Sequence, residues 1–137
     1  MIVYLDTSVV LRILFNQPAP LRQWGTWESG YSSELLEIES RRAIDRLRLE
    51  GDLDDEGVAK AHEELAKIES AMGRVRLSPT ILRRATLPMP TAVKTLDAIH
   101  LTSALALRER RDPGIFFATH DGQQRIAARA LGFVCLG

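Results

Sequence analysis

Two aspartates follow apolar runs that are typical of buried strands. Asp6 comes directly after Ile2–Leu5, and Asp121 comes two residues after the end of the run 115–119. Unbroken apolar runs of this length indicate strands that are covered on both faces in a parallel sheet. Because polar sites in open parallel sheets form beyond the carboxyl ends of the strands, we expect both carboxylates at one sheet edge. Taken singly, each aspartate is equally well explained as a helix N-cap or a turn residue.

A glutamate stands where a predicted helix should be apolar. In the helix predicted over 33–50, Glu39 lies four residues after Leu35 and shares its face. Glu37 points elsewhere and can pair with Arg41 at i+4, which is the usual role of a solvated helix charge. We therefore prefer Glu39 to Glu37 as the functional acid of this helix.

Asp97 is similarly out of place near the start of the most hydrophobic helix of the chain, predicted over 95–110. Burial of an unpaired carboxylate costs several kcal/mol unless a cation or hydrogen bonds compensate, so a positive group is expected nearby. The alternative for Asp97 is a first-turn acid stabilised by the helix dipole, by about 0.3–1 kcal/mol. For Glu39 the alternative is a buried glutamate paired to Arg42 or Arg46.

Convergence of these acids would have a defined chemistry. Mutual repulsion would raise their pKa values unless a multivalent cation neutralised them. Hard oxygen donors without a His or Cys cluster favour magnesium or manganese over zinc. Such a metal lowers the pKa of a water and orients it in line with a phosphorus, so hydrolysis needs no protein nucleophile. Ser8 lacks a triad pattern and is expected to cap the first helix or orient Asp6, and His100 to be a packed or hydrogen-bonded core residue.

Strands and helices are predicted to alternate along the chain, which indicates an α/β sandwich with a mainly parallel sheet. Thr7 or Ser8 is expected to cap the first helix, and Ser32 or Ser33 the second. Residues 16–31 are predicted to be a loop or a broken helix. The predicted strands cover residues 2–5, 75–77, 115–119 and 133–136; the predicted helices cover residues 9–14, 33–50, 58–68, 80–86, 95–110 and 123–131.

Composition places the chain among ordinary globular proteins. Its 137 residues suit one domain over 1–137, with 45% hydrophobic and 26% charged residues. Basic and acidic residues number 18 each, so nucleic-acid binding would have to be local. Fifteen of the basic residues are arginine, whose planar fork suits phosphate. Four of them lie in the 33–50 helix and could form a patch or simply solvate it: Arg41, Arg42, Arg46 and Arg48.

The N-terminus and the cysteine content bear on location. Four apolar residues before Asp6 are too few for a signal-peptide core or a membrane span. The single cysteine, Cys135, excludes an intrachain disulfide and a Cys-rich zinc site. We therefore expect a protein of the reducing cytoplasm without a membrane partner.

The order of the motifs resembles that of PIN domains, and the VapC-type toxins of bacterial toxin–antitoxin pairs are the closest match. The motifs are MIVYLDTS with Asp6, EIESRRA with Glu39, LDAIHL with Asp97, and ATHD with Asp121. The resemblance implies a three-layer α/β/α sandwich and a magnesium- or manganese-dependent endoribonuclease. It also implies a metal held by the four acids, with three supporting residues: Thr7, Ser8 and Thr119.

The same resemblance implies partners: an RNA substrate, a small cognate antitoxin laid across the acidic groove, and a second copy of the chain in a homodimer. Three alternatives remain open. One is an RNA-processing or DNA-cleaving PIN nuclease without an antitoxin, and another is a PIN-like binding module that no longer binds metal. The third, a phosphatase with Asp6 as nucleophile, lacks the second aspartate expected at the position of Ser8.

Overall fold

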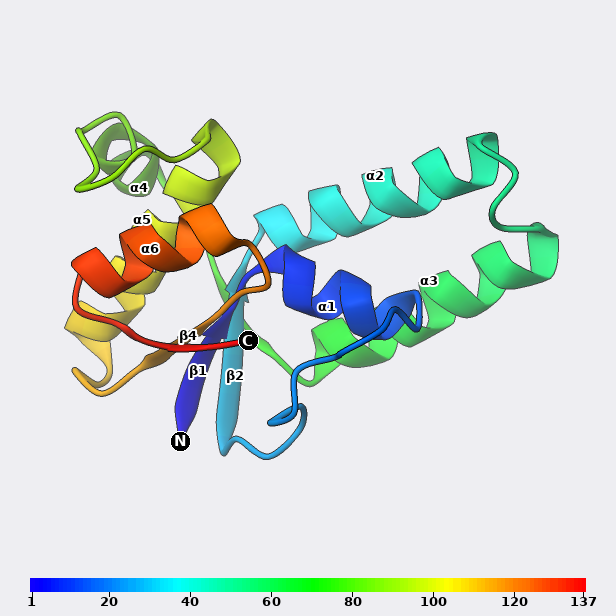
Figure 1. Ribbon diagram of the computed structural model, residues 1–137, viewed down its shortest axis with the longest axis horizontal. Helices are drawn as coiled ribbons and strands as arrows, with labels where there is room; N and C mark the ends of the chain where they lie inside the picture. Colours follow the sequence, from blue (N-terminus) through cyan, green and yellow to red (C-terminus); the bar gives the residue numbers. More distant parts are fainter.

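The computed structural model describes all residues, 1–137, and is built around a five-stranded sheet in the order β3-β2-β1-β4-β5 (Figure 1). Every strand pair is parallel. The strands are β1 (Ile2–Leu5), β2 (Ser29–Ser33), β3 (Gly73–Val75), β4 (Phe116–Ala118) and β5 (Val134–Leu136). The helices are α1 (Thr7–Leu14), α2 (Leu35–Leu49), α3 (Asp55–Ser70), α4 (Pro79–Arg84), α5 (Thr95–Arg110) and α6 (Gly122–Ala130).

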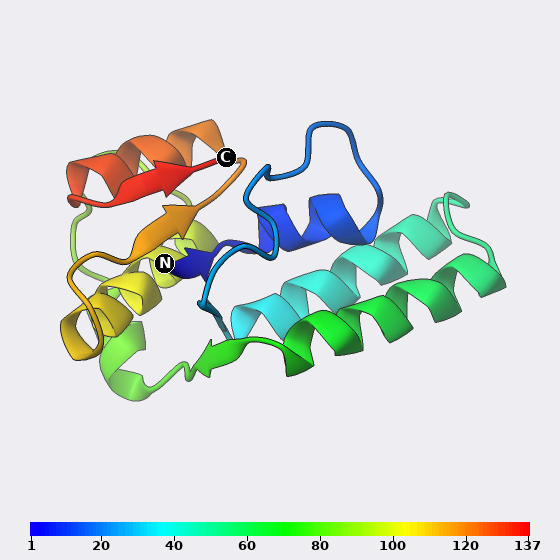
Figure 2. The same ribbon diagram turned by 90° about the horizontal axis from the view of Figure 1, so that it is seen from below.

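Alternation along β1 separates the two faces of the sheet. Tyr4 is fully buried in one core cluster together with Leu101 of α5 and Ala127 of α6. Val3 and Leu5 are fully buried in a second cluster, on the α1 side. Because successive side chains of a strand point to opposite faces, helices must cover both, as Figures 1 and 2 show. The predicted α/β sandwich with a central parallel sheet is confirmed.

Helices α2 and α3 correspond to the helices predicted over 33–50 and 58–68, and they form a hairpin that extends beyond the sheet (Figure 2). A third cluster of apolar side chains fastens this hairpin to α1, with Val10, Ile44 and Leu65 at its centre. Gly51, in the left-handed region at φ 80°, follows the end of α2 and lets the chain turn back. None of the helices combines the length and the apolar character needed to cross a membrane.

The prediction for residues 16–31 was wrong at its end, because Ser29–Ser33 is the strand β2, paired with β1 and β3. Its small polar sequence carries no hydrophobic signal. Ser32 is nevertheless buried, and its hydroxyl donates to the Leu5 carbonyl at 2.7 Å. Gly30 lies so close to Trp27 that an added Cβ would be 2.6 Å from the indole nitrogen. Side-chain hydrogen bonding and close packing therefore replace apolar burial in this strand.

Other boundaries differ by one to three residues. The strand expected over 75–77 is Gly73–Val75, because its pairing with β2 starts at Gly73. The first helix is capped by Asp6 and not by Thr7 or Ser8, since the Asp6 carboxylate accepts the Ser8 amide. The N-cap of α2 is Glu34 and not Ser32 or Ser33, although the Ser33 hydroxyl accepts the Leu35 amide at 3.0 Å.

Candidate active site

Asp6 and Asp121 lie at the same edge of the sheet, as their places after two strands predict. Strands β1 and β4 are parallel neighbours, and the Asp6 amide continues the ladder to the Ala118 carbonyl at 2.9 Å. Asp6 is buried and Asp121 half-buried. Each also caps a helix, Asp6 through Oδ2 to the Ser8 amide (3.0 Å) and Asp121 through Oδ1 to the Gln124 amide (2.8 Å). The capping interpretation therefore holds for both, and it leaves Oδ2 of Asp121 without a protein donor.

Gln124 is a residue of this edge that was not predicted from the sequence. It is fully buried, and its Nε2 donates to Oδ1 of Asp6 at 3.1 Å. Its Oε1 accepts the Thr119 hydroxyl at 2.7 Å, and the oxygen of that hydroxyl accepts the Asp121 amide at 3.0 Å. One side chain thus links the two aspartates. The available signal was a polar residue three before Ala127 on an otherwise apolar helix face, the same signal that identified Glu39.

Ser8 ties helix α1 to the loop that carries Asp121. Its Oγ accepts the His120 amide at 3.1 Å and lies 3.4 Å from the Thr119 hydroxyl. These contacts fix the backbone of the loop against the N-terminal turn of α1. Ser8 and Thr119 are thus placed to support Asp6 and Asp121.

Glu39 is held by two donors on a single oxygen. Its Oε1 accepts the Thr7 hydroxyl at 2.9 Å and lies 2.6 Å from Nε2 of His100. Its Oε2 has no protein donor, and a quarter of the side chain is exposed. The alternative in which Glu39 pairs with Arg42 or Arg46 is wrong. Glu39 therefore reaches the acidic edge with one oxygen anchored and one free.

His100 is the polar partner that Asp6 and Glu39 share. It is fully buried, with Nδ1 2.8 Å from the Tyr4 hydroxyl and Nε2 3.5 Å from Oδ1 of Asp6. Burial lowers the pKa of His100, but the hydrogen bond to Glu39 and the charges of Asp6, Glu39 and Asp97 outweigh burial and raise it. Both ring nitrogens are engaged, so the prediction of a hydrogen-bonded core histidine is confirmed.

Glu37 lies outside this arrangement, and its predicted partner was wrong. The Glu37 carboxylate pairs with Arg74 at 3.0 Å. The Arg41 guanidinium reaches only the main-chain carbonyl of Glu37, at 3.2 Å, and binds both carboxylate oxygens of Glu69 at 2.6 and 3.2 Å. Bidentate geometry on α3 is stronger than an i+4 contact along α2, which explains the exchange of partners.

Asp97 reports electrostatically that the four acids are close together. It is half-buried in the first turn of α5. Burial is the largest cause that raises the pKa of Asp97 to about 6, followed by the charges of Asp6 and Asp121; Glu39 adds to them and His100 opposes them. Asp97 lies in the first turn of α5, as the helix-dipole alternative requires, so this alternative stands beside the role in the acidic cluster.

The positions of the acids do not form a finished metal site, whereas the chemistry of their donor atoms suits one. No group of three or more His, Cys, Asp or Glu side chains is drawn together as a preformed metal-holding set. The donor atoms nevertheless suit a hard cation, because all are carboxylate oxygens, and both Glu39 and Asp121 keep an oxygen free of protein donors. The chemistry of these donor atoms therefore fits a hard divalent cation.

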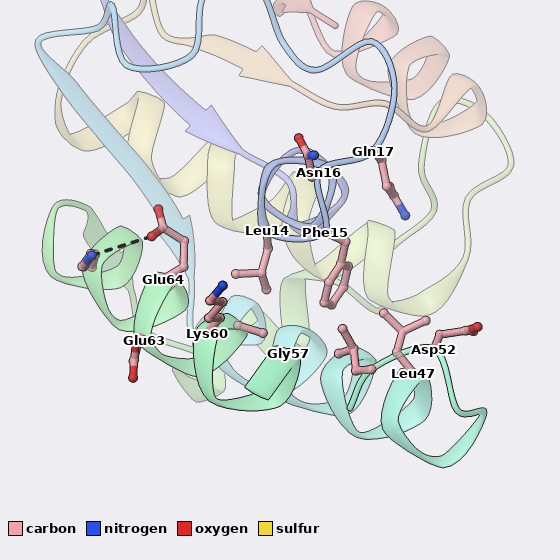
Figure 3. Close-up of a pocket in the computed structure, with 13 residues that line it drawn as sticks. Leu14, Phe15, Asn16, Gln17, Leu47, Asp52, Gly57, Lys60, Glu63 and Glu64 are labelled. Atoms are coloured by element: carbon pink, nitrogen blue, oxygen red, sulfur yellow. Dashed lines mark ion pairs between the residues drawn. The ribbon is translucent and has the colours of Figure 1, made fainter. Parts of the chain in front are cut away.

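A separate hollow lies between the end of α1 and the α2–α3 hairpin (Figure 3). Phe15 and Leu47 contribute apolar surface, and Lys60 and Glu64 line the opposite wall. None of the four acids lines this hollow. It is not part of the candidate site.

Comparison with protein families gives one match: the family model described as the PIN domain aligns with residues 3–129. The aligned range contains all four acids and the three residues that support them. Comparison with curated protein sequences gives no match.

Proposed function

Because the chain belongs to the PIN-domain family, whose fold is of a nuclease type, we propose that it is a magnesium- or manganese-dependent endoribonuclease. The observation that carries this proposal is the placement of Asp6 and Asp121 at one edge of the sheet, where Gln124 links them. Glu39 joins this edge through His100, and the raised pKa of Asp97 agrees with a concentration of negative charge there. Several carboxylates held close together repel one another. A divalent cation binds such a site favourably, since it relieves the repulsion.

In this proposal the four acids hold the metal, and the remaining residues hold the acids. A divalent cation bound there would polarise a phosphodiester and lower the pKa of the attacking water. Gln124 keeps Oδ1 of Asp6 in place, and His100 and Thr7 keep Oε1 of Glu39 in place. Fixed second partners of this kind orient carboxylate ligands and typically matter 10–100-fold for affinity or activity.

The finer proposal is that the protein is the toxin of a VapBC-type pair, with a small antitoxin as partner and a homodimer as its assembly. The order of the four motifs supports this proposal, and so does the family match over nearly the whole chain. A PIN nuclease without an antitoxin and an inactive PIN-like binding module are the alternatives. A short neighbouring reading frame, whose purified product blocks cleavage, would favour the toxin; a product without effect would favour the nuclease without an antitoxin.

Glu39→Gln and Glu37→Gln form a matched pair on one helix. We expect Glu39→Gln to reduce metal-dependent RNA cleavage by about 10–100-fold, because an amide is a poorer ligand and loses the ionic bond to His100. Glu37→Gln should stay within about twofold of wild type, because Glu37 faces Arg74 outside the cluster. Initial rates on a single-stranded RNA with manganese measure both.

Unfolding in urea provides the control for this pair. Both variants should retain a cooperative unfolding transition. A reduced cleavage rate then cannot be explained by unfolding of the variant. Equal activity of the two variants, or a larger loss for Glu37→Gln, would remove Glu39 from the proposed metal ligands.

A further inference from the structure

A small positively lined hollow adjoins the acidic cluster. Its volume is about 280 Å³, and Ser8 and Asp121 form the wall that it shares with the cluster. Arg12 of α1, Arg46 of α2 and His120 of the β4–α6 loop supply basic side chains, and Gln17 is the remaining polar residue of its lining. We call it the arginine hollow. Enclosed sites for small molecules usually measure roughly 300–1,000 Å³, so its size suits a single anionic group of a larger ligand better.

Arg12 is positioned but not neutralised. Its Nη1 donates to the main-chain carbonyls of Pro18 and Ala19 at 3.4 and 3.2 Å, and it forms no ion pair. These carbonyls hold the guanidinium group in place without cancelling its charge. Its remaining N–H groups are therefore available to an anion.

Arg46 likewise has no acidic partner, in contrast to Arg41 and Arg48 on the same helix. Arg41 is paired with Glu69 of α3, and Arg48 with Asp45 of α2. Arg46 is exposed and has no carboxylate within ion-pair distance, although Asp121 lines the same hollow. Two unpaired guanidinium groups thus face one hollow from two different helices.

His120 adds an unsatisfied polar atom to the lining of the hollow. Its Nε2 is buried and has no hydrogen-bond partner. A buried polar atom without a partner calls for an explanation, and a bound ligand oxygen would supply one.

We infer that the arginine hollow binds the backbone phosphate next to the scissile phosphodiester in a single-stranded RNA, and so sets the register of the strand at the acidic cluster. The inference rests on the proposed nuclease function. Guanidinium groups match phosphate oxygens bidentately. Asp121 lines both the arginine hollow and the acidic cluster, so the two sites are adjacent. A ligand whose anionic group lies in the hollow must therefore extend directly into the cluster. A polymer with regularly repeated phosphates meets this requirement, with one phosphate in the hollow and the next at the proposed metal.

The experiment measures binding of a fluorescein-labelled single-stranded RNA by anisotropy, in EDTA and over a range of salt concentrations. Arg12→Gln and Arg46→Gln should each weaken binding by about tenfold, and each should reduce the slope of log K against log salt by about 0.7, the loss of one phosphate contact. Arg42→Gln is the matched control, because Arg42 is an exposed arginine one turn earlier on α2 and does not line the hollow. It should bind within about twofold of wild type.

Arg12→Lys separates geometry from charge, because it keeps the charge and loses the planar fork; it should fall between wild type and Arg12→Gln. Stabilisation of each variant by manganese should match wild type, which shows that the acidic cluster is intact. Losses equal to that of Arg42→Gln would make the effect one of net charge and overturn the inference, and so would a wild type that binds no RNA. Selective losses in a protein that does not cleave RNA with metal would keep the arginine hollow and reject the proposed nuclease.

Discussion

Asp97→Asn is expected to stabilise the metal-free protein near neutral pH and to lower RNA cleavage by at least about 100-fold. The two effects have one cause. In the folded protein the pKa of Asp97 is about 6, above its ordinary value of 3.8, so the fold disfavours its charge. Asparagine removes that charge and also removes a proposed metal ligand. After allowance for its solvent exposure, the expected gain is about 1 kcal/mol, or a few degrees in melting temperature.

The sign of the pH dependence follows from the direction of the shift. An acid whose pKa is raised on folding binds more protons in the folded state between the two values, so its contribution to stability falls as pH rises from about 4 to 6. The stability difference between variant and wild type should thus be largest above pH 6 and vanish near pH 4. Thermal unfolding in EDTA across this range measures it, with Asp52→Asn, an exposed carboxylate, as control. Equal stability of Asp97→Asn and wild type at every pH would mean that the acids do not repel one another.

His100→Ala is expected to destabilise the protein by roughly 3 kcal/mol. The substitution removes the partner of Glu39 at 2.6 Å and of the Tyr4 hydroxyl at 2.8 Å, and it empties space in a fully buried position. Loss of one member of a buried pair typically costs about 3–5 kcal/mol. The exposed quarter of Glu39 places the expected loss at the lower end. Burial also raises the pKa of the Tyr4 phenol, so Tyr4 stays neutral and adds no negative charge near the unpaired Glu39.

Urea unfolding of the metal-free protein measures this loss, and His62→Ala, at an exposed histidine, provides the control with an expected change within about 0.5 kcal/mol. His100→Gln retains a donor near Glu39 and should lie between alanine and wild type. A loss below about 1 kcal/mol for His100→Ala would show that the hydrogen bonds of His100 contribute little to the fold.

The predictable parts of the fold are those in which buried positions produce a hydrophobic pattern in the sequence. The apolar run of β1 and the apolar stretch of α5 predicted where these elements lie, and they therefore also predicted the places of Asp6 and Asp97. Strand β2 was missed because Ser32 and Gly30 are accommodated by a hydrogen bond and by close packing against Trp27. The hydrogen bond from Ser32 to Leu5 joins residues that are far apart in the sequence, so no local sequence pattern indicates it.

In the candidate site, local patterns identified the acids but not the residues that hydrogen-bond to them. Each acid stood out locally, after a strand or on an apolar helix face. The roles of Gln124 and His100 depend on atoms 118 and 61 positions away along the chain, in Asp6 and Glu39. Their spacing carries no signal of these contacts, although the polarity of Gln124 on an apolar face could have been noticed.

The most direct test of the central claim is cleavage of a mixed panel of RNAs by the purified chain with magnesium, with manganese or with EDTA, beside a folded Asp6→Asn variant. Asp6 is buried at the sheet edge, held by Gln124 and near His100, so its substitution alters the acidic cluster at its centre. The proposed mechanism predicts cleavage that requires a metal and that Asp6→Asn abolishes. Metal-independent cleavage would contradict the proposed metal mechanism. Equal behaviour of wild type and variant would contradict the catalytic assignment and favour the PIN-like binding module.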